Sequence, residues 1–327
     1  MDNVNKTEST YDAYITLTLR EECKFSCKFV SGNTEDEQIK LIEPQKLEKS
    51  KIFVYKFENL KNRQEYKYRC GTEFSEISTL QFPYNQDAVK ILILTDKQSK
   101  DEATKTMDFF KDKKRMFDTV ISMGKMGFEN VDKEGDEFLE IMKPMFSNIP
   151  LMNAIDVYDD SLQDQWMNKK FTLPNKENLK SLYYSFDVGN AHFVSVPSNY
   201  LVNQVMEQNS ENLKSFSNWL KEDLSNTKMK WKILYTSKPL HCSDKESEIC
   251  HNSLELKHSL EYLIEEHKVN MVITGGVSGF QVLFPVMNLH AYQEAKEKNH
   301  TTIMHPNFAV FELCASLKAK KHNYGKE

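Results

Sequence analysis

The segment 184–193 constrains the fold of this chain more than any other stretch of its sequence. Two apolar stretches, 182–187 and 191–197, flank the dipeptide Gly189-Asn190. Glycine and asparagine tolerate the backbone conformations that a tight turn between antiparallel strands requires. The segment therefore predicts a β-hairpin whose turn is Gly189-Asn190.

Strands alternate with helices on both sides of this hairpin. Apolar segments predict further strands at 89–94, 117–122, 150–155, 231–235, 269–274 and 308–313. Amphipathic or charged segments predict helices at 101–114, 133–146, 207–226 and 253–267. This alternation is typical of an α/β fold with short crossovers.

The first part of the chain has a different pattern. Alternating β-branched and aromatic residues predict strands at 14–19, 52–57 and 66–70, and we find no helical period between them. We therefore expect a small β domain at residues 1–86, followed by the α/β domain at residues 87–327.

Composition excludes several classes of function. The formal net charge is −5 and no basic block is present, so we expect no nucleic-acid partner. No apolar run approaches the roughly 20 residues that span a bilayer. The polar start at residues 1–6 lacks the apolar core of a signal peptide. We therefore expect an intracellular, soluble protein, cytoplasmic or cytoskeletal/ciliary, with a mitochondrial location as the alternative.

Six cysteines are present, at positions 23, 27, 70, 242, 250 and 314. In a reducing compartment we expect free thiols rather than bridges. Cys242 and Cys250 lie eight positions apart and can meet across a short loop if the compartment is oxidising. None has the C-x-x-C spacing that is typical of zinc sites.

The hairpin segment resembles the YSFDVGxxHF signature of the purple acid phosphatases, a branch of the metallophosphoesterases. The segment 219–224, WLKEDL, is similar to the WLxxDL of the same family. The resemblance implies a two-sheet β-sandwich flanked by helices, preceded by a fibronectin type III-like β domain. It also implies seven metal ligands, carried by five sequence blocks at the ends of strands, that hold two cations for phosphate ester hydrolysis.

The five blocks are present in order, but their ligand positions have changed. The family's G-D-x-G reads Thr95-Asp96-Lys97-Gln98, its G-D-x-x-Y reads GKMGF at 124–128, and its G-N-H-E follows Pro150 as DVYD at 156–159. Its H-R-P-M-Y-C-S reads SKPLHCS at 237–243, and its G-H-x-H reads GGVS at 275–278. The ligand positions that the resemblance implies are Asp96, Lys125, Phe128, Val157, Ser237, Gly276 and Ser278, and the former phosphate-contact position is Tyr158.

Of these seven positions, only Asp96 carries a side chain that binds metal well. A protonated lysine at 125 cannot coordinate a cation, and one carboxylate does not hold a catalytic ion. We therefore expect no metal, no cofactor and no catalytic residue. The sequence predicts a pseudoenzyme, a non-catalytic pseudophosphatase that acts as a structural or interaction subunit and contacts other proteins of a larger assembly.

Several alternatives stay open at this point. The chain can be an active phosphomonoesterase that takes metal ligands from outside the five blocks. It can also bind a phosphate ligand without hydrolysis, in a cleft lined by Tyr158, Lys97 and Lys238. Two further hypotheses are an ion pair between Lys125 and Asp96, and a relocated metal site at the cluster His241, Cys242, Cys250 and His251.

Overall fold

The structure of the chain is a computed structural model, and it describes a little over half of the sequence. The described residues are 10–18, 26–31, 45–46, 52–61, 64–71, 78–81, 89–95, 100–110, 117–123, 131–154, 171, 182–206, 210–240, 253–275, 280–282, 286–287, 290–291 and 309–313. Among the helices of these segments, none combines the length and the apolar character needed to cross a membrane.

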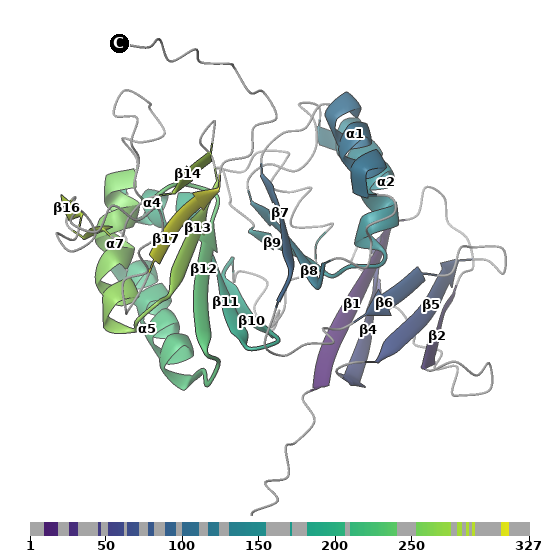
Figure 1. Ribbon diagram of the computed structural model, residues 1–327, viewed down its shortest axis with the longest axis horizontal. Coiled ribbons are helices and arrows are strands. Elements are labelled where there is room, and N and C mark those ends of the chain that lie inside the picture. The colour runs from purple at the N-terminus through teal and green to yellow at the C-terminus, as the bar shows by residue number, and fades with distance from the viewer. Residues whose placement is uncertain are drawn as a thin grey trace, which may run out of the picture.

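Two antiparallel sheets of three strands each, here called the N-terminal sheets, form the start of the fold (Figure 1). One has the order β1-β4-β3, with β1 at Thr10–Thr18, β4 at Ile52–Lys61 and β3 at Gln45–Lys46. The other has the order β2-β5-β6, with β2 at Ser26–Ser31, β5 at Glu65–Gly71 and β6 at Ser78–Gln81. Their shared core contains Cys27, Tyr55, Phe57, Leu60 and Tyr66. The predicted strands of this region are confirmed, whereas its likeness to a fibronectin type III domain stays a prediction.

A disulfide links Cys27 of β2 to Cys70 of β5. The expectation of free thiols is therefore wrong for this pair. The two cysteines stand directly opposite each other in the β2–β5 register. Since they are 43 residues apart in the sequence, only the strand pairing brings them together. The other pair that the sequence suggested, Cys242 and Cys250, lies outside the described residues.

A parallel sheet of three strands, the first α/β sheet, follows these strands. It contains β7 at Ile91–Thr95, β8 at Thr119–Met123 and β9 at Leu151–Ala154, in that order. Helices α1, Lys100–Phe110, and α2, Val131–Phe146, cover one face. Their apolar sides bury Ala103, Met107, Phe138, Met142 and Met145 against Val120. Each of these elements was predicted from the sequence.

The second α/β sheet has six strands in the order β10-β11-β12-β13-β17-β14. Their bounds are Tyr184–Val188, Ala191–Val196, Trp231–Thr236, Met271–Thr274, Ala309–Leu313 and Phe280–Val282, respectively. The four central strands are parallel, and β10 and β14 pair antiparallel at the two edges. A short separate ribbon pairs β15, Val286–Met287, with β16, His290–Ala291.

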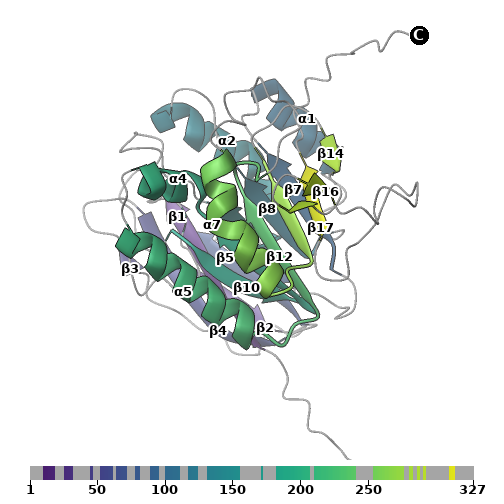
Figure 2. The same ribbon diagram turned by 90° about the vertical axis from the view of Figure 1, so that its left-hand side faces the viewer.

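Three helices lie over the outer face of the second α/β sheet, as Figure 2 shows. They are α4 at Ser198–Met206, α5 at Ser210–Asn226 and α7 at Ser253–Glu266. The sequence predicted α5 and α7 but missed α4. The segment of α4 carries Asn199, Asn203 and Gln204 among its apolar residues, and asparagine is a weak helix former. Its buried residues Leu201 and Val202 belong to the core beneath the helices, so tertiary packing overrides local propensity here.

The inner faces of the two α/β sheets share one apolar layer. Ile121, Met123 and Ala154 of the first sheet pack with residues of the second sheet. The partners from the second sheet are Tyr184, Val188, Ala191, Phe193, Ile233, Tyr235 and Ile273. The structure is thus a two-sheet α/β sandwich with helices on its outer faces, which confirms the α/β architecture predicted for this part of the chain.

Two buried phenols add polar contacts between these sheets. The Tyr184 hydroxyl donates to the Asn153 carbonyl of β9 at 2.7 Å, and the Tyr235 hydroxyl donates to the Tyr184 oxygen at 2.9 Å. Burial raises the pKa of both tyrosines, which keeps them protonated as donors. The contacts therefore fix the distance between β9 and the second sheet at one point.

One lysine joins the ends of two helices to the sheet. The Lys232 ammonium at the start of β12 donates to the Leu224 carbonyl of α5 at 2.6 Å and to the His267 carbonyl behind α7 at 3.1 Å. The last carbonyls of a helix have no partner within the helix and carry partial negative charge. Burial, together with the charge of Lys268, lowers the pKa of this lysine. Lys232 thus holds the carboxyl ends of both helices at the amino edge of the second α/β sheet.

The hairpin turn has the geometry that the sequence predicted. β10 and β11 pair in antiparallel register up to Val188 and Ala191, which leaves Gly189-Asn190 as a two-residue turn. Gly189 has φ 61°, in the left-handed region that favours glycine.

A side chain at Gly189 should therefore destabilise the hairpin. We expect Gly189→Ala to lower the free energy of unfolding by about 1–2 kcal/mol, because an L-residue in this region meets its own carbonyl. Urea unfolding of the variant and the parent chain measures the difference. Asn190→Ala, at the second turn position, is the matched control and should change the free energy by less than about 0.5 kcal/mol. Equal effects of the two substitutions would contradict the left-handed conformation of Gly189.

Candidate functional site

The five ligand blocks all follow the carboxyl ends of parallel strands. Asp96 comes directly after β7, and Lys125 and Phe128 follow the end of β8 at Met123. Val157 follows β9, and Ser237 comes directly after β12. Gly276 and Ser278 follow β13, which ends at Thr274. Ligands of α/β proteins bind at the carboxyl ends of such strands. Here β7, β8 and β9 belong to the first α/β sheet, and β12 and β13 belong to the second.

The backbone brings three of these blocks into contact. A Cβ atom added to Gly275 would lie 3.3 Å from the carbonyl oxygen of Ser237 and 3.4 Å from the Cβ of Met123. Met123 immediately precedes the second block, Ser237 opens the fourth and Gly275 opens the fifth. The two α/β sheets therefore approach each other closely at the place where the family resemblance puts its metal ions.

Most of the predicted site residues lie outside the described part of the chain. These are Asp96, Lys97, Lys125, Phe128, Val157, Tyr158, Gly276 and Ser278, together with the cluster His241, Cys242, Cys250 and His251. The hypotheses of a Lys125–Asp96 pair, a relocated metal site and an anion cleft stay predictions.

Ser237 is the one inherited ligand position that the structure describes. Its side chain is buried, with 6% of the residue exposed, and its hydroxyl shares a hydrogen bond of 2.8 Å with the Ser198 hydroxyl. The backbone N–H of Lys238 donates to the same Ser198 oxygen at 3.2 Å. Ser198 begins α4, so these contacts attach the end of β12 to the start of that helix.

This arrangement does not fit a metal ligand. A neutral hydroxyl is a poor replacement for the imidazole of the family pattern, and this hydroxyl already takes part in a contact within the fold. Within the residues that the structure describes, no group of three or more His, Cys, Asp or Glu side chains is placed to hold a metal ion.

A second polar arrangement, here called the histidine clamp, joins the hairpin to α5. His192 of β11 lies between two carboxylates: its Nδ1 is 2.7 Å from Asp187 Oδ1, and its Nε2 is 2.8 Å from Asp223 Oδ2. The histidine side chain is 7% exposed, whereas Asp223 is 17% and Asp187 is 43% exposed. Ser185 donates to the other Asp223 oxygen at 2.6 Å.

The charges of the clamp decide its chemistry. Burial of the imidazole opposes its charge, but the hydrogen bonds to Asp187 and Asp223 and their negative charge raise the pKa of His192 to about 9. The ring is therefore an imidazolium at neutral pH, and both of its nitrogens donate to carboxylates. A general base needs a free nitrogen lone pair, so the clamp holds the hairpin against α5 and is not a catalytic triad.

Two of the three members of this clamp belong to the hairpin signature. Asp187 and His192 are the Asp and His of the YSFDVGxxHF signature, and a two-residue turn after Val188 places them opposite each other in the hairpin register. Asp223 is the Asp of the WLxxDL segment. Periodicity alone does not show that α5 crosses the hairpin at this point, so the third member was not predictable.

The clamp predicts a specific dependence of stability on pH. The pKa of His192 is raised from 6.5 to about 9 in the folded chain, so its contribution is complete below pH 6.5 and is lost as the pH rises toward 9. Since Asp187 is partly exposed and screened by water, we expect the free energy of unfolding to fall by about 2 kcal/mol over this range. Urea unfolding at several pH values measures it.

His192→Gln should abolish this fall in stability between pH 6.5 and 9. His267→Gln is the matched control, because His267 follows α7, and among the described residues its ring nitrogens lie 3.4 Å from the Ser225 hydroxyl and 3.6 Å from a carboxylate oxygen of Glu266. The control should keep the dependence of the parent chain. A His192→Gln variant that loses stability with the same pH profile as the parent would refute the charged clamp.

Comparison with known proteins agrees with this fold and signature. No protein-family model matches the chain. Acid phosphatase type 7 of Homo sapiens is 22% identical over 203 residues, which cover 57% of this chain and 45% of that protein. Purple acid phosphatase 21 of Arabidopsis thaliana is 25% identical over 258 residues, covering 74% of this chain and 55% of that protein. The chain thus spans about half the length of these relatives.

A solved structure, that of PhoD, is similar in fold. The TM-score is 0.56 at 13% identity, and the match covers 93% of this chain and 74% of the PhoD chain. At this identity the similarity supports the arrangement of the sheets and helices alone. Together with the hairpin signature, these comparisons show that the chain is similar to purple acid phosphatases in sequence and to PhoD in fold.

Proposed function

We propose that the chain is a pseudophosphatase, a non-catalytic member of this fold that serves as a structural or interaction subunit of a larger protein assembly. The observation that supports it best is Ser237, where a buried hydroxyl engaged with Ser198 replaces a histidine ligand. A side chain that holds β12 against α4 is not free to coordinate a metal.

The other six positions support the proposal through their chemistry. Val157 and Gly276 carry no donor atom in their side chains, and Phe128 has lost the oxygen of the family's tyrosine. Lys125 brings a positive charge to the position of a bridging carboxylate, which repels cations. Ser278, like Ser237, offers a neutral hydroxyl. Asp96 alone keeps a strong donor, and two-metal catalysis requires a complete donor set around both ions.

The proposed division of the chain follows its strand composition. We propose a fibronectin-like β-sandwich domain at residues 1–86 and a degenerate metallophosphoesterase domain at 87–327. The two antiparallel N-terminal sheets support the first domain, and the helix-flanked sandwich supports the second. The intracellular location also stays a prediction, and the Cys27–Cys70 disulfide argues against it, because disulfides are typical of oxidising compartments.

An active phosphomonoesterase is the competing function. It is favoured by the relatives, which are named acid phosphatase type 7 and purple acid phosphatase 21. For this chain, such an activity would require metal ligands from outside the five blocks, because the blocks retain one.

A phosphate ester assay separates the two functions. We expect the purified chain, supplied with zinc, iron, manganese or magnesium, to hydrolyse p-nitrophenyl phosphate no faster than its Asp96→Asn variant. The physical reason is that one carboxylate does not hold two catalytic ions. Turnover by the parent chain that Asp96→Asn abolishes would establish the phosphatase and end the pseudoenzyme proposal.

The assembly role needs its own measurement. The chain has a mass of 38.3 kDa. We expect the native protein in a gentle extract to elute at several times this mass in size-exclusion chromatography, whereas the purified chain elutes near it. Elution of the native protein as a free monomer would argue against a subunit role.

A further inference from the structure

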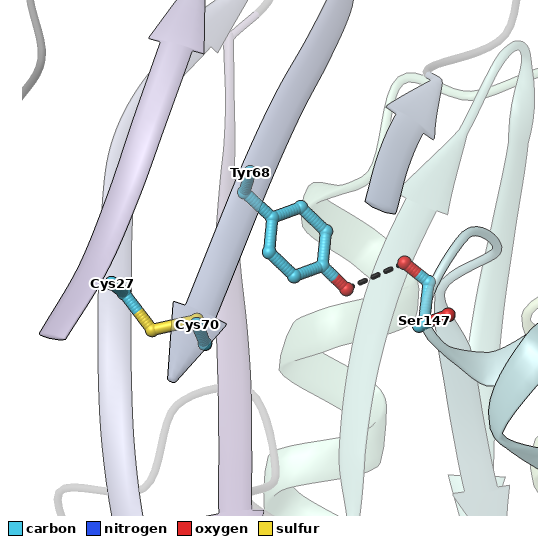
Figure 3. The surroundings of a disulfide bond; sticks show 4 residues. All are labelled: Cys27, Tyr68, Cys70 and Ser147. Carbon is cyan, nitrogen blue, oxygen red and sulfur yellow. Dashed lines mark hydrogen bonds between the residues drawn. A yellow bond between two sulfur atoms is a disulfide. The ribbon is translucent and has the colours of Figure 1, made fainter. Parts of the chain in front are cut away.

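Two hydrogen bonds attach the N-terminal sheets to the α/β part at one turn. The Tyr68 hydroxyl of β5 donates to the Ser147 carbonyl at 2.5 Å (Figure 3), and the Thr79 N–H of β6 donates to the Asn148 side-chain oxygen at 2.9 Å. Asn148 also donates to the Pro144 carbonyl of α2 at 2.8 Å, which fixes the acceptor. We call these contacts of Tyr68 and Thr79 with Ser147 and Asn148 the docking joint.

The disulfide lies in the same sheet, close to this joint. Cys70 follows Tyr68 by two residues on β5, so both side chains emerge on the same face of the strand. Both side chains are partly buried and pack against the core between the N-terminal sheets. Among the described strands, β2 pairs only with β5, and Cys27–Cys70 is the covalent link between them. The disulfide therefore fixes the strand that carries Tyr68.

Burial connects reduction of this bond to opening of the sheets. Cys27 is 0% exposed and packs in one core with Tyr55 and Phe57. Cys70 is half-buried and is the sulfur that a reductant reaches, but the thiolate that leaves is Cys27 in the apolar core, where a charge is strongly disfavoured. Local separation of the N-terminal sheets therefore favours reduction, and it also disturbs β5 and its contact with Ser147.

We propose that the redox state of Cys27–Cys70 controls the docking of the N-terminal sheets onto the Ser147–Asn148 turn. The oxidised bond favours the docked arrangement, and the docked arrangement protects the bond from reductants. This coupling is a property of the N-terminal half of the fold and does not depend on the proposed lack of catalysis. Because a coupling free energy is reciprocal, weakening either side must weaken the other.

The chemical step is a thiol–disulfide exchange with a dithiol. One thiolate of the dithiol attacks the Cys70 sulfur, forms a mixed disulfide and releases Cys27 as a thiolate, which takes up a proton. The second thiol of the dithiol then displaces Cys70, so that two protein thiols and one oxidised, cyclic disulfide result. Two electrons and two protons pass from the dithiol to the protein.

The first arm of the test follows docking while the redox state changes. The full chain, oxidised or reduced with dithiothreitol, is compared by hydrogen exchange with mass spectrometry. We expect reduction to increase exchange in peptides that cover β5, β6 and residues 143–150, while peptides from α5 and β12 stay unchanged. A Cys27→Ser, Cys70→Ser double variant should match the reduced chain. Reduction that leaves the exchange of 143–150 unchanged would overturn the proposal.

The second arm tests the coupling in the reverse direction, from the docking joint to the disulfide. Differential alkylation and peptide mass spectrometry measure how fast Cys27 and Cys70 become reduced, separately from the four other cysteines. We expect Tyr68→Phe to accelerate this reduction about fivefold, which corresponds to the loss of one buried hydrogen bond. Tyr262→Phe is the matched control, since Tyr262 lies on α7 with 61% of its surface exposed, and it should leave the rate unchanged.

Asn148→Ala provides an independent test if Tyr68→Phe perturbs the fold of β5. It removes the acceptor of the Thr79 N–H on the α/β side of the joint and leaves the sequence of the N-terminal sheets unchanged. We expect it to accelerate reduction as well. If neither variant reduces faster than Tyr262→Phe, the bond and the joint are uncoupled and the proposal is wrong.

Discussion

The packing of the two α/β sheets against each other is the constraint on which the rest of this structure depends. Phe193, Tyr235 and Ile121 are fully or almost fully buried in the layer between them. Apolar burial stabilises a fold by roughly 25 cal/mol per Å², independently of any bound ion. This layer lies beside the carboxyl ends of the strands and contains none of the seven ligand positions that the family resemblance implies. The fold therefore keeps its shape when those positions change. The sheets then close together at Gly275, Ser237 and Met123.

Apart from the Tyr184 and Tyr235 hydroxyls within the layer, the polar contacts described for the second α/β sheet lie at its margins. Lys232 holds the helix ends at the amino edge, and Ser198 and Ser237 join α4 to the strand ends at the carboxyl edge. The histidine clamp fixes the hairpin edge to α5. In each of these contacts the polar side chain has a partner that satisfies its charge or hydrogen-bonding capacity. The Asp and His of the YSFDVGxxHF segment and the Asp of the WLxxDL segment thus have a structural role in this fold.

Much of the fold could be predicted from the sequence, because it rests on local patterns. The segment of β12 is an apolar run typical of a buried strand, and the segment of α2 has the amphipathic period of a helix. Gly189-Asn190 consists of residues that favour a tight turn. What depends on pairing between distant segments could not be predicted. The Cys27–Cys70 bond follows from a register that no spacing reveals, and α4 forms because Leu201 and Val202 are buried against other helices. For the candidate site, the sequence placed Ser237 at the end of a predicted strand, which β12 confirms, but it did not predict the contact of Ser237 with Ser198.

Metal ligands at the ends of strands and an apolar layer between sheets make different demands on the same strands. In this chain the two lie in different parts of each strand. A catalytic two-metal site needs several charged groups held close together, which repel one another until the ions bind. Uncharged side chains at such positions, like the hydroxyl of Ser237, carry no such repulsion, and a fold that has them does not need ions for its stability. Strain and charge at an active site are maintained by function and are relieved when function is lost. The histidine clamp and the Ser198–Ser237 contact therefore stabilise this fold without any bound ion.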